Sequence, residues 1–208
     1  MFNDSQLLDW EKTQALIVYL ANKCELGKTK LMKLLYFIDF SHFEKHGESV
    51  TNSVYYHWQY GPVPTAVYGQ LEELSILKSD TNEQKLFSQE NELILEGVNI
   101  HRIIPYYDVK ISTVFNREEL QTIHDVLLMY GEKNASDLTR ESHETKPYQM
   151  TKSNEMIPYY LVHYKNWNKP SASEIFTPDV LAELNIVDEN SNFVNREFIK
   201  INTELCAH

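Results

Sequence analysis

Cysteine is scarce in this sequence, with only Cys24 and Cys206 among 208 residues. Two cysteines so far apart form neither a disulfide framework nor the paired spacing of a zinc site. Long apolar runs are missing too, since the longest, residues 15–21, falls well short of the roughly 20 residues of a membrane-spanning helix. The first residues lack the basic start and apolar stretch of a secretion signal. We therefore expect a cytoplasmic protein with no membrane partner.

Basic residues are too few to balance the acidic ones. Lys and Arg number 19 against 30 Asp and Glu, which gives a formal net charge of −11 at pH 7. Proteins that hold DNA or RNA by phosphate neutralisation need basic surface, so nucleic acid is not the expected partner. The remaining composition is typical of a globular protein that builds its core without a metal or disulfide.

Glycine and proline are also few, so each one can be interpreted as a boundary signal. Apolar residues recur every three or four positions in several segments, which predicts helices over residues 5–24, 29–46, 65–77, 116–130 and 136–144. Asp4 or Ser5, Thr29 and Asn116 are the expected N-caps of the first, second and fourth helices. Gly47 is expected to end the second helix, and Pro147 to stop the last.

Residues 50–60 have the β-branched and aromatic composition of a strand. Gly61-Pro62-Val63-Pro64 follows, and we expect a rigid turn there because two prolines remove two backbone donors. Residues 93–95 and 98–104, separated by Glu96-Gly97, predict two further short strands. The predicted fold class is α+β and predominantly helical: a compact helical domain over residues 1–150 with a small antiparallel β element, and a C-terminal extension over 151–208 packed on the same core.

Patterns for catalysis and metal binding are weak. His42 and His46 are four residues apart on a predicted helix, but two histidines without a third ligand are more often the solvated end of an amphipathic helix. No phosphate loop, nucleophile elbow or cysteine–histidine pattern is present. We therefore predict no metal, no cofactor and no catalytic residue.

Two segments have the composition of contact surfaces. In residues 54–60, alternation places Tyr56 and Trp58 on the face expected to fill the core, and Tyr55 and His57, together with Tyr60, on the opposite side. Aromatic side chains before a stiff turn favour protein contacts because little conformational entropy is lost on binding.

The second segment, residues 139–148, is dense in polar side chains near a predicted helix end. His143 in this segment has three open roles: a structural hydrogen bond, a partner contact, or acid–base chemistry.

A resemblance to a known family covers about residues 5–150. The residues that carry it are Lys33-Leu34-Leu35-Tyr36 with Asp39 and His42, Gly61-Pro62-Val63 with Tyr68, Tyr130-Gly131 with Leu138, and Ser142-His143 with Pro147-Tyr148. In this order and spacing they resemble the Panacea family, the SocA-like antitoxin domain. Tyr148 is a departure, since such domains often carry tryptophan after the proline, and residues 151–208 are not covered.

The resemblance implies a bacterial or phage antitoxin that neutralises a cognate toxin by direct protein binding. One branch of the family acts instead as an adaptor that delivers its toxin to an ATP-dependent protease, and a histidine-dependent hydrolase is the remaining alternative. No catalytic residue comes with the family. Leu34, Leu35 and Tyr36 are expected in the core. The candidate partner-binding residues are Tyr55, His57, Tyr60, Gly61, Pro62, His143, Pro147 and Tyr148, and the oligomeric state stays open.

Overall fold

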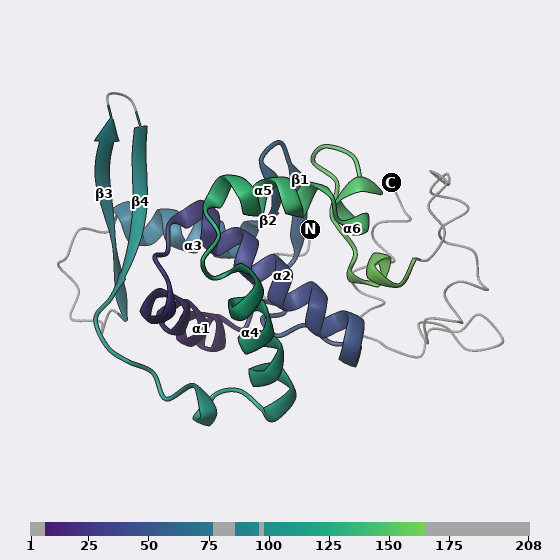
Figure 1. Cartoon of the computed structure of the whole chain (residues 1–208), viewed down its shortest axis with the longest axis horizontal. Coiled ribbons are helices and arrows are strands. Elements are labelled where there is room, and N and C mark those ends of the chain that lie inside the picture. The colour runs from purple at the N-terminus through teal and green to yellow at the C-terminus, as the bar shows by residue number, and fades with distance from the viewer. Residues whose placement is uncertain (1–6, 77–85, 96–97, 165–208) are drawn as a thin grey trace. The chain divides into compact units, whose positions relative to one another are not determined.

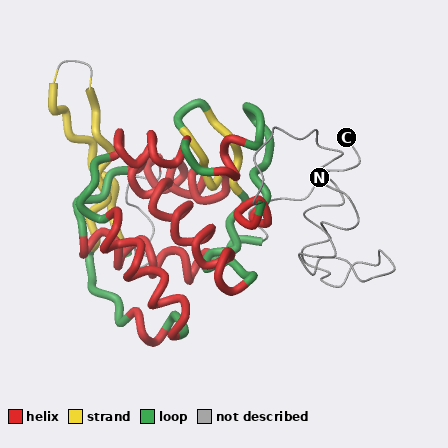
Figure 2. The backbone as a smooth tube through the Cα atoms, turned by 45° about the vertical axis from the view of Figure 1, so that its right-hand side comes forward, coloured by secondary structure: helices red, strands yellow, loops and turns green. Residues whose placement is uncertain are grey.

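The computed structural model describes residues 7–76, 86–95 and 98–164. The chain divides into two compact units, Met1–Val162 and His163–His208, and the first contains nearly all of the described residues. Its elements are α1 (Trp10–Lys23), α2 (Lys28–His46), β1 (Tyr55–Trp58), β2 (Gly61–Pro64), α3 (Thr65–Ile76), β3 (Phe87–Leu95), β4 (Val98–Pro105), α4 (Arg117–Tyr130), α5 (Ala135–His143) and α6 (Lys146–Gln149), with short 3-10 turns at Ile111–Thr113 and Tyr159–His163. This mostly helical architecture with small antiparallel sheets confirms the predicted fold class (Figures 1 and 2).

Helix α2 is the central element of the first unit. It contacts α4, α5, β2 and β4, and its residues are buried almost continuously from Lys30 to Phe43. A helix buried on most of its surface is surrounded by other elements, and Figure 1 shows α2 in the middle of the helices. Leu34 and Leu35 are fully buried and Tyr36 nearly so, which confirms their predicted place in the core.

The observed helix ends agree only in part with those predicted from the sequence. Asn116 and Glu119 form the reciprocal capping box predicted for α4, and Gly47 ends α2 with a φ of +78°. Helix α1 instead begins at Trp10, where the side chain of Asp9 accepts the Lys12 amide; Asp4 and Ser5 lie outside the described residues. The prediction for Thr29 is wrong, because α2 begins earlier, with Gly27 as its N-cap.

The segment predicted as a turn, Gly61–Pro64, is strand β2, which pairs antiparallel with β1. Pro62 lies opposite His57, and Pro64 lies opposite Tyr55. The backbone groups of His57 and Tyr55 bond on the other side of β1, where His57 N donates to Glu155 O (2.8 Å) and Ile157 N donates to Tyr55 O (2.7 Å). The prolines therefore occupy positions at which the β1–β2 ladder needs no donor, and the strand tolerates them.

The second hairpin, β3–β4, confirms the two strands predicted around Glu96-Gly97, although both are longer than expected and that dipeptide lies outside the described residues. It projects from the helices in Figure 1. Ile103 N donates to Leu26 O (2.8 Å), which attaches the base of the hairpin to the segment between α1 and α2.

The end of the first unit corrects one prediction and bears on another. Pro147 does not stop α5, which already ends at His143; it lies in the first turn of α6, where its missing N–H costs nothing. Ile157 belongs to the core, while residues 165–208 of the predicted extension lie outside the described residues.

In the described ranges, no helix combines the length and apolar character needed to span a membrane.

Candidate functional site

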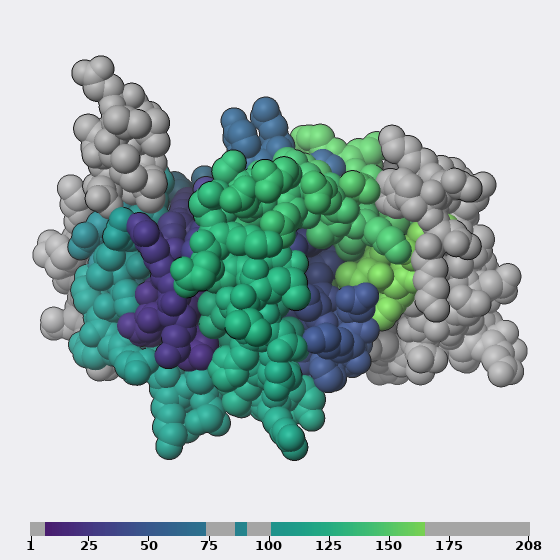
Figure 3. Space-filling view, viewed as in Figure 1, coloured from purple at the N-terminus to yellow at the C-terminus, as the bar shows by residue number. Residues whose placement is uncertain are grey.

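Elements far apart in the sequence meet at one corner of the first unit. The β1–β2 hairpin contacts α2 and α5, and α5 contacts α6. We call this region the hairpin corner and define it by Lys33, His57, Gly61, Ser142, His143 and Tyr148. In Figure 3 the blue hairpin tip stands out from the surface beside the green segment that contains α5 and α6.

Three rings form a stack in the hairpin corner. The centroids of His57 and Tyr148 are 3.7 Å apart with planes at 20°, and those of Tyr148 and His143 are 4.5 Å apart with planes at 8°. The hydroxyl of Tyr148 donates to Trp58 O (2.8 Å), and Nδ1 of His57 is hydrogen-bonded to Thr151 Oγ1 (3.1 Å). The structure thus joins the two segments that the sequence indicated separately as contact surfaces.

Both imidazoles of the stack are held toward their neutral form. Burial lowers the pKa of His57, and burial followed by the charges of Lys33 and His57 lowers the pKa of His143. A neutral imidazole stacks on tyrosine without the desolvation cost of a charge, so the stack is a rigid, weakly polar base for the hairpin.

Lys33 of α2 is only 1% exposed and lies close enough to His143 for its charge to lower the pKa of that histidine. Its Nζ donates to Pro62 O (2.9 Å), and burial lowers its pKa to about 7. Lys33 was named only for the family resemblance and not as a candidate site residue. The available signal was a lysine inside the apolar stretch Leu31-Met32-Lys33-Leu34-Leu35.

Gly61 is required by close packing in the hairpin corner. Its φ is +97°, a conformation that L side chains rarely adopt. A Cβ at this position would lie 2.7 Å from Ser142 Oγ and 2.8 Å from Lys33 Nζ. The backbone of β2 can therefore approach α2 and α5 only because residue 61 has no side chain.

Most polar groups of the hairpin corner are engaged in structural bonds, whereas Nε2 of His143 is buried without a hydrogen-bond partner among the described residues. The hydroxyl of Ser142 donates to Thr139 O (2.7 Å), and both Ser142 and Lys33 are buried. A serine, a lysine and two histidines thus come together, but neither the serine nor the lysine is exposed to a substrate. The arrangement favours a preorganised recognition surface over a reaction centre.

The predicted contact residues have unequal exposure. Tyr60 is 71% exposed at the hairpin tip, and His57 and His143 are half-buried. The other five are buried: Tyr55, Gly61, Pro62, Pro147 and Tyr148. Those five are therefore not positioned to contact a partner directly.

Tyr55 is the clearest correction, because it faces the core where the alternation placed a contact residue. Its ring lies against Tyr36 of α2, with centroids 5.6 Å apart, and its hydroxyl donates to Asp39 Oδ2 (2.7 Å). Tyr56 and Trp58, expected in the core, are half-buried instead. The alternation correctly separated two faces, but α2 covers the face that carries Tyr55.

Asp39 organises the loop that leads into the hairpin. Its Oδ1 accepts the amides of Val50 and Thr51 at 2.9 Å each, and its Oδ2 accepts the hydroxyls of Thr51 (2.5 Å) and Tyr55 (2.7 Å). Burial raises the pKa of this carboxyl, although the four donors act in the opposite direction. Asp39 therefore fixes β1 to α2 from inside the core.

Comparison with protein families gives one match. Residues 31–149, more than half of the chain, match the family described as antitoxin SocA-like, Panacea domain. The matched range contains all six residues of the hairpin corner. No curated protein and no solved structure matches the chain significantly.

Proposed function

Because the chain belongs to the SocA-like antitoxin family with the Panacea domain, we propose that it neutralises a cognate toxin by binding it directly, with the hairpin corner as the contact. Family membership suggests the antitoxin role and implies a toxin partner. The binding mechanism and the surface are our inference from the geometry of the corner.

The observation that carries this proposal is the exposed Tyr60 on a rigid support. Trp58 pairs with Gly61, so Gln59 and Tyr60 form the tip of the hairpin. The ring stack and the bond from Lys33 to Pro62 O hold the hairpin from below. An exposed aromatic side chain on a fixed backbone loses little entropy on binding and can supply much of the energy of an interface.

The net charge supports a protein partner of opposite sign. A chain with a formal charge of −11 attracts a basic protein at long range. Such attraction accelerates association and weakens as salt rises. We therefore expect a basic toxin, whose association rate with this protein falls with ionic strength.

The experiment begins with the genes next to the one that encodes this chain. Each neighbour is expressed in cells alone and together with the full chain, and growth is measured. We expect one neighbour to arrest growth alone, and co-expression to restore growth and give a stoichiometric complex on co-purification. If every neighbour is harmless alone, the antitoxin proposal is wrong.

The same assay distinguishes the adaptor mechanism from direct binding. An adaptor requires the host protease, so rescue would disappear in cells that lack ATP-dependent proteases and toxin levels would fall during rescue. Direct neutralisation predicts rescue in those cells at unchanged toxin levels.

A further inference from the structure

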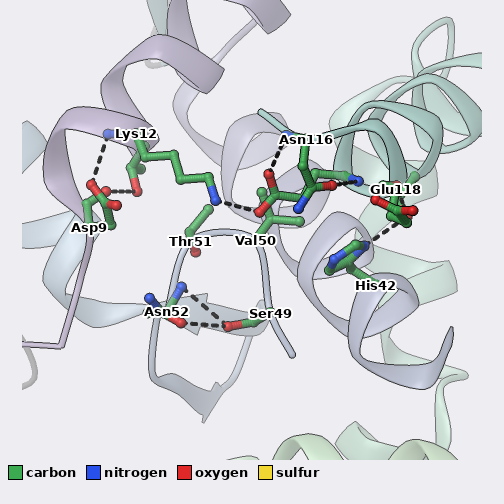
Figure 4. A network of polar contacts seen from close by, with 12 residues as sticks. Asp9, Lys12, His42, Ser49, Val50, Thr51, Asn52, Asn116 and Glu118 are labelled. Atoms are coloured by element: carbon green, nitrogen blue, oxygen red, sulfur yellow. Dashed lines mark hydrogen bonds and ion pairs between the residues drawn. The ribbon is translucent and has the colours of Figure 1, made fainter. Parts of the chain in front are cut away.

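His42 of α2 is a fully buried histidine whose protonation is set by a neighbour. Its Nδ1 is 3.0 Å from Thr122 Oγ1, and that hydroxyl lies 3.1 Å from Glu118 O. A hydroxyl has one proton, which the carbonyl of Glu118 receives, so Nδ1 of His42 must donate to Thr122. The lone pair of this imidazole is therefore on Nε2. Figure 4 shows His42 facing the part of α4 that contains Glu118.

Nε2 of His42 has no hydrogen-bond partner within the described part of the chain, although it is buried. Buried polar atoms in proteins are nearly always paired, and each exception calls for an explanation. A lone pair fixed in direction and left unpaired has the form of a metal ligand. The Nδ1–H bond to Thr122 is also the type of outer bond that orients ligating histidines.

His46 supplies a second imidazole next to the ring of His42. It is one helical turn further along α2, and the two ring centroids are 4.5 Å apart with planes at 33°. His46 is exposed, so the pair can be approached from its side.

Acidic and basic groups both act on the two histidines. The two histidines lie in the last turns of α2, where the helix dipole is negative. Burial, followed by the charge of His46, lowers the pKa of His42 and keeps its imidazole neutral, which is the form that binds metals; Glu119 and Glu48 act in the opposite direction, and Lys12 adds to the lowering. Lys12 is itself paired with Glu119, as part of the network in Figure 4 that includes Asn116.

We propose that His42 and His46 form a two-imidazole site for a divalent transition-metal ion such as Zn²⁺. Imidazole nitrogens suit zinc, copper and nickel. No group of three or more His, Cys, Asp or Glu side chains within the described ranges is arranged to hold a metal, so the remaining positions are open to water or to an external ligand. Rotation of the exposed His46 ring admits the ion to Nε2 of His42. This site lies outside the hairpin corner, and its failure would leave the antitoxin proposal untouched.

Calorimetric titration of the purified full chain with Zn²⁺ tests the site. We expect one site per chain, weakened at least tenfold in His46→Ala. This variant changes an exposed residue and is expected to fold. His101→Ala is the matched control, because it removes another exposed histidine, from β4, and it should bind as the unchanged chain does. Mg²⁺, which prefers oxygen ligands, should not bind at this site.

Nuclear magnetic resonance identifies the ligands independently of affinity. Addition of Zn²⁺ should shift the imidazole signals of His42 and His46 before those of any other histidine. The proposal is wrong if the chain binds no Zn²⁺, if His46→Ala binds it as tightly as the unchanged chain, if His101→Ala weakens binding equally, or if other histidines shift first.

Discussion

The ring of His57 lies 3.7 Å from the ring of Tyr148 and almost parallel to it, which joins the β1–β2 hairpin to α6. On its other face, Tyr148 stacks on His143 of α5. Its hydroxyl also donates to Trp58 O within the hairpin. Tyr148 is therefore the residue through which the last helices of the domain hold the hairpin in place.

Tyr148→Ala should destabilise the fold by about 3–5 kcal/mol, because it removes a buried ring together with its stacking partners. Tyr148→Phe keeps the stack and loses only the bond to Trp58 O, so its effect should be about 1 kcal/mol. Urea unfolding measures both. Equal destabilisation by the two variants would show that the hydroxyl, rather than the ring, holds the hairpin.

Gly61→Ala should destabilise the fold by about 2–4 kcal/mol. The new Cβ meets Ser142 Oγ and Lys33 Nζ at less than 3 Å, and φ at this position is positive. Gly69→Ala is the matched control, since a Cβ at that position in α3 meets nothing within 4 Å. The control should be neutral or stabilising by up to about 1 kcal/mol, because alanine favours helix. A tolerated Gly61→Ala would contradict the packing of the hairpin corner.

Lys33 should make the free energy of unfolding depend on pH between about 7 and 10.5. Its pKa is about 7 in the folded protein and 10.5 in the unfolded chain. Between these values the unfolded chain binds more protons, so the free energy of unfolding should rise with pH, by up to about 1.4 kcal/mol per unit. Below about pH 7 both states carry the proton, and the contribution of Lys33 no longer changes.

Lys33→Met tests this assignment, because methionine has a similar length and no charge. The difference in free energy of unfolding between the unchanged chain and the variant, measured in urea from about pH 7 to pH 10, should change steadily with pH. Other groups that titrate in this range cancel in the difference. A difference independent of pH would mean that Lys33 keeps its ordinary pKa.

Asp39→Asn should destabilise the fold by about 2–4 kcal/mol despite its similar shape. Four donors point at the two carboxylate oxygens, and an amide group would direct its own N–H toward at least one of them. Hydrogen exchange should show the largest loss of protection at the amides of Val50 and Thr51. Unchanged protection there would contradict the role given to Asp39.

Local signals predicted most of the helices. Asn116 with Glu119, and Gly47, act through bonds within a few residues of themselves, so their roles can be inferred without the rest of the fold. Whether the two prolines of β2 can stand in a strand, by contrast, depends on a segment distant in the sequence. Residues 154–157 bond to the backbone groups of His57 and Tyr55 on the other side of β1, so no backbone donor is needed at Pro62 or Pro64.

The candidate site was predictable as two segments but not as one place. The aromatic hairpin and the polar segment around His143 were both visible in the sequence, whereas their contact through His57 and Tyr148 is tertiary. Alternation separates two faces of a strand but does not say which face α2 will cover, and this is why Tyr55 was misplaced. Lys33 was missed because a lysine between apolar residues can also extend to solvent, and only the fold shows that this one is buried.

The most direct test of the account is the affinity of the toxin, once identified, for Tyr60→Ala and for Tyr106→Ala. Both variants remove a tyrosine that is more than half exposed, 71% for Tyr60 and 53% for Tyr106, so neither should disturb the fold. If the hairpin tip contacts the toxin, Tyr60→Ala should weaken binding by about 1–3 kcal/mol and reduce rescue of growth, while Tyr106→Ala should do neither. Unchanged affinity in Tyr60→Ala, with both variants folded, would contradict the placement of the toxin on the hairpin corner.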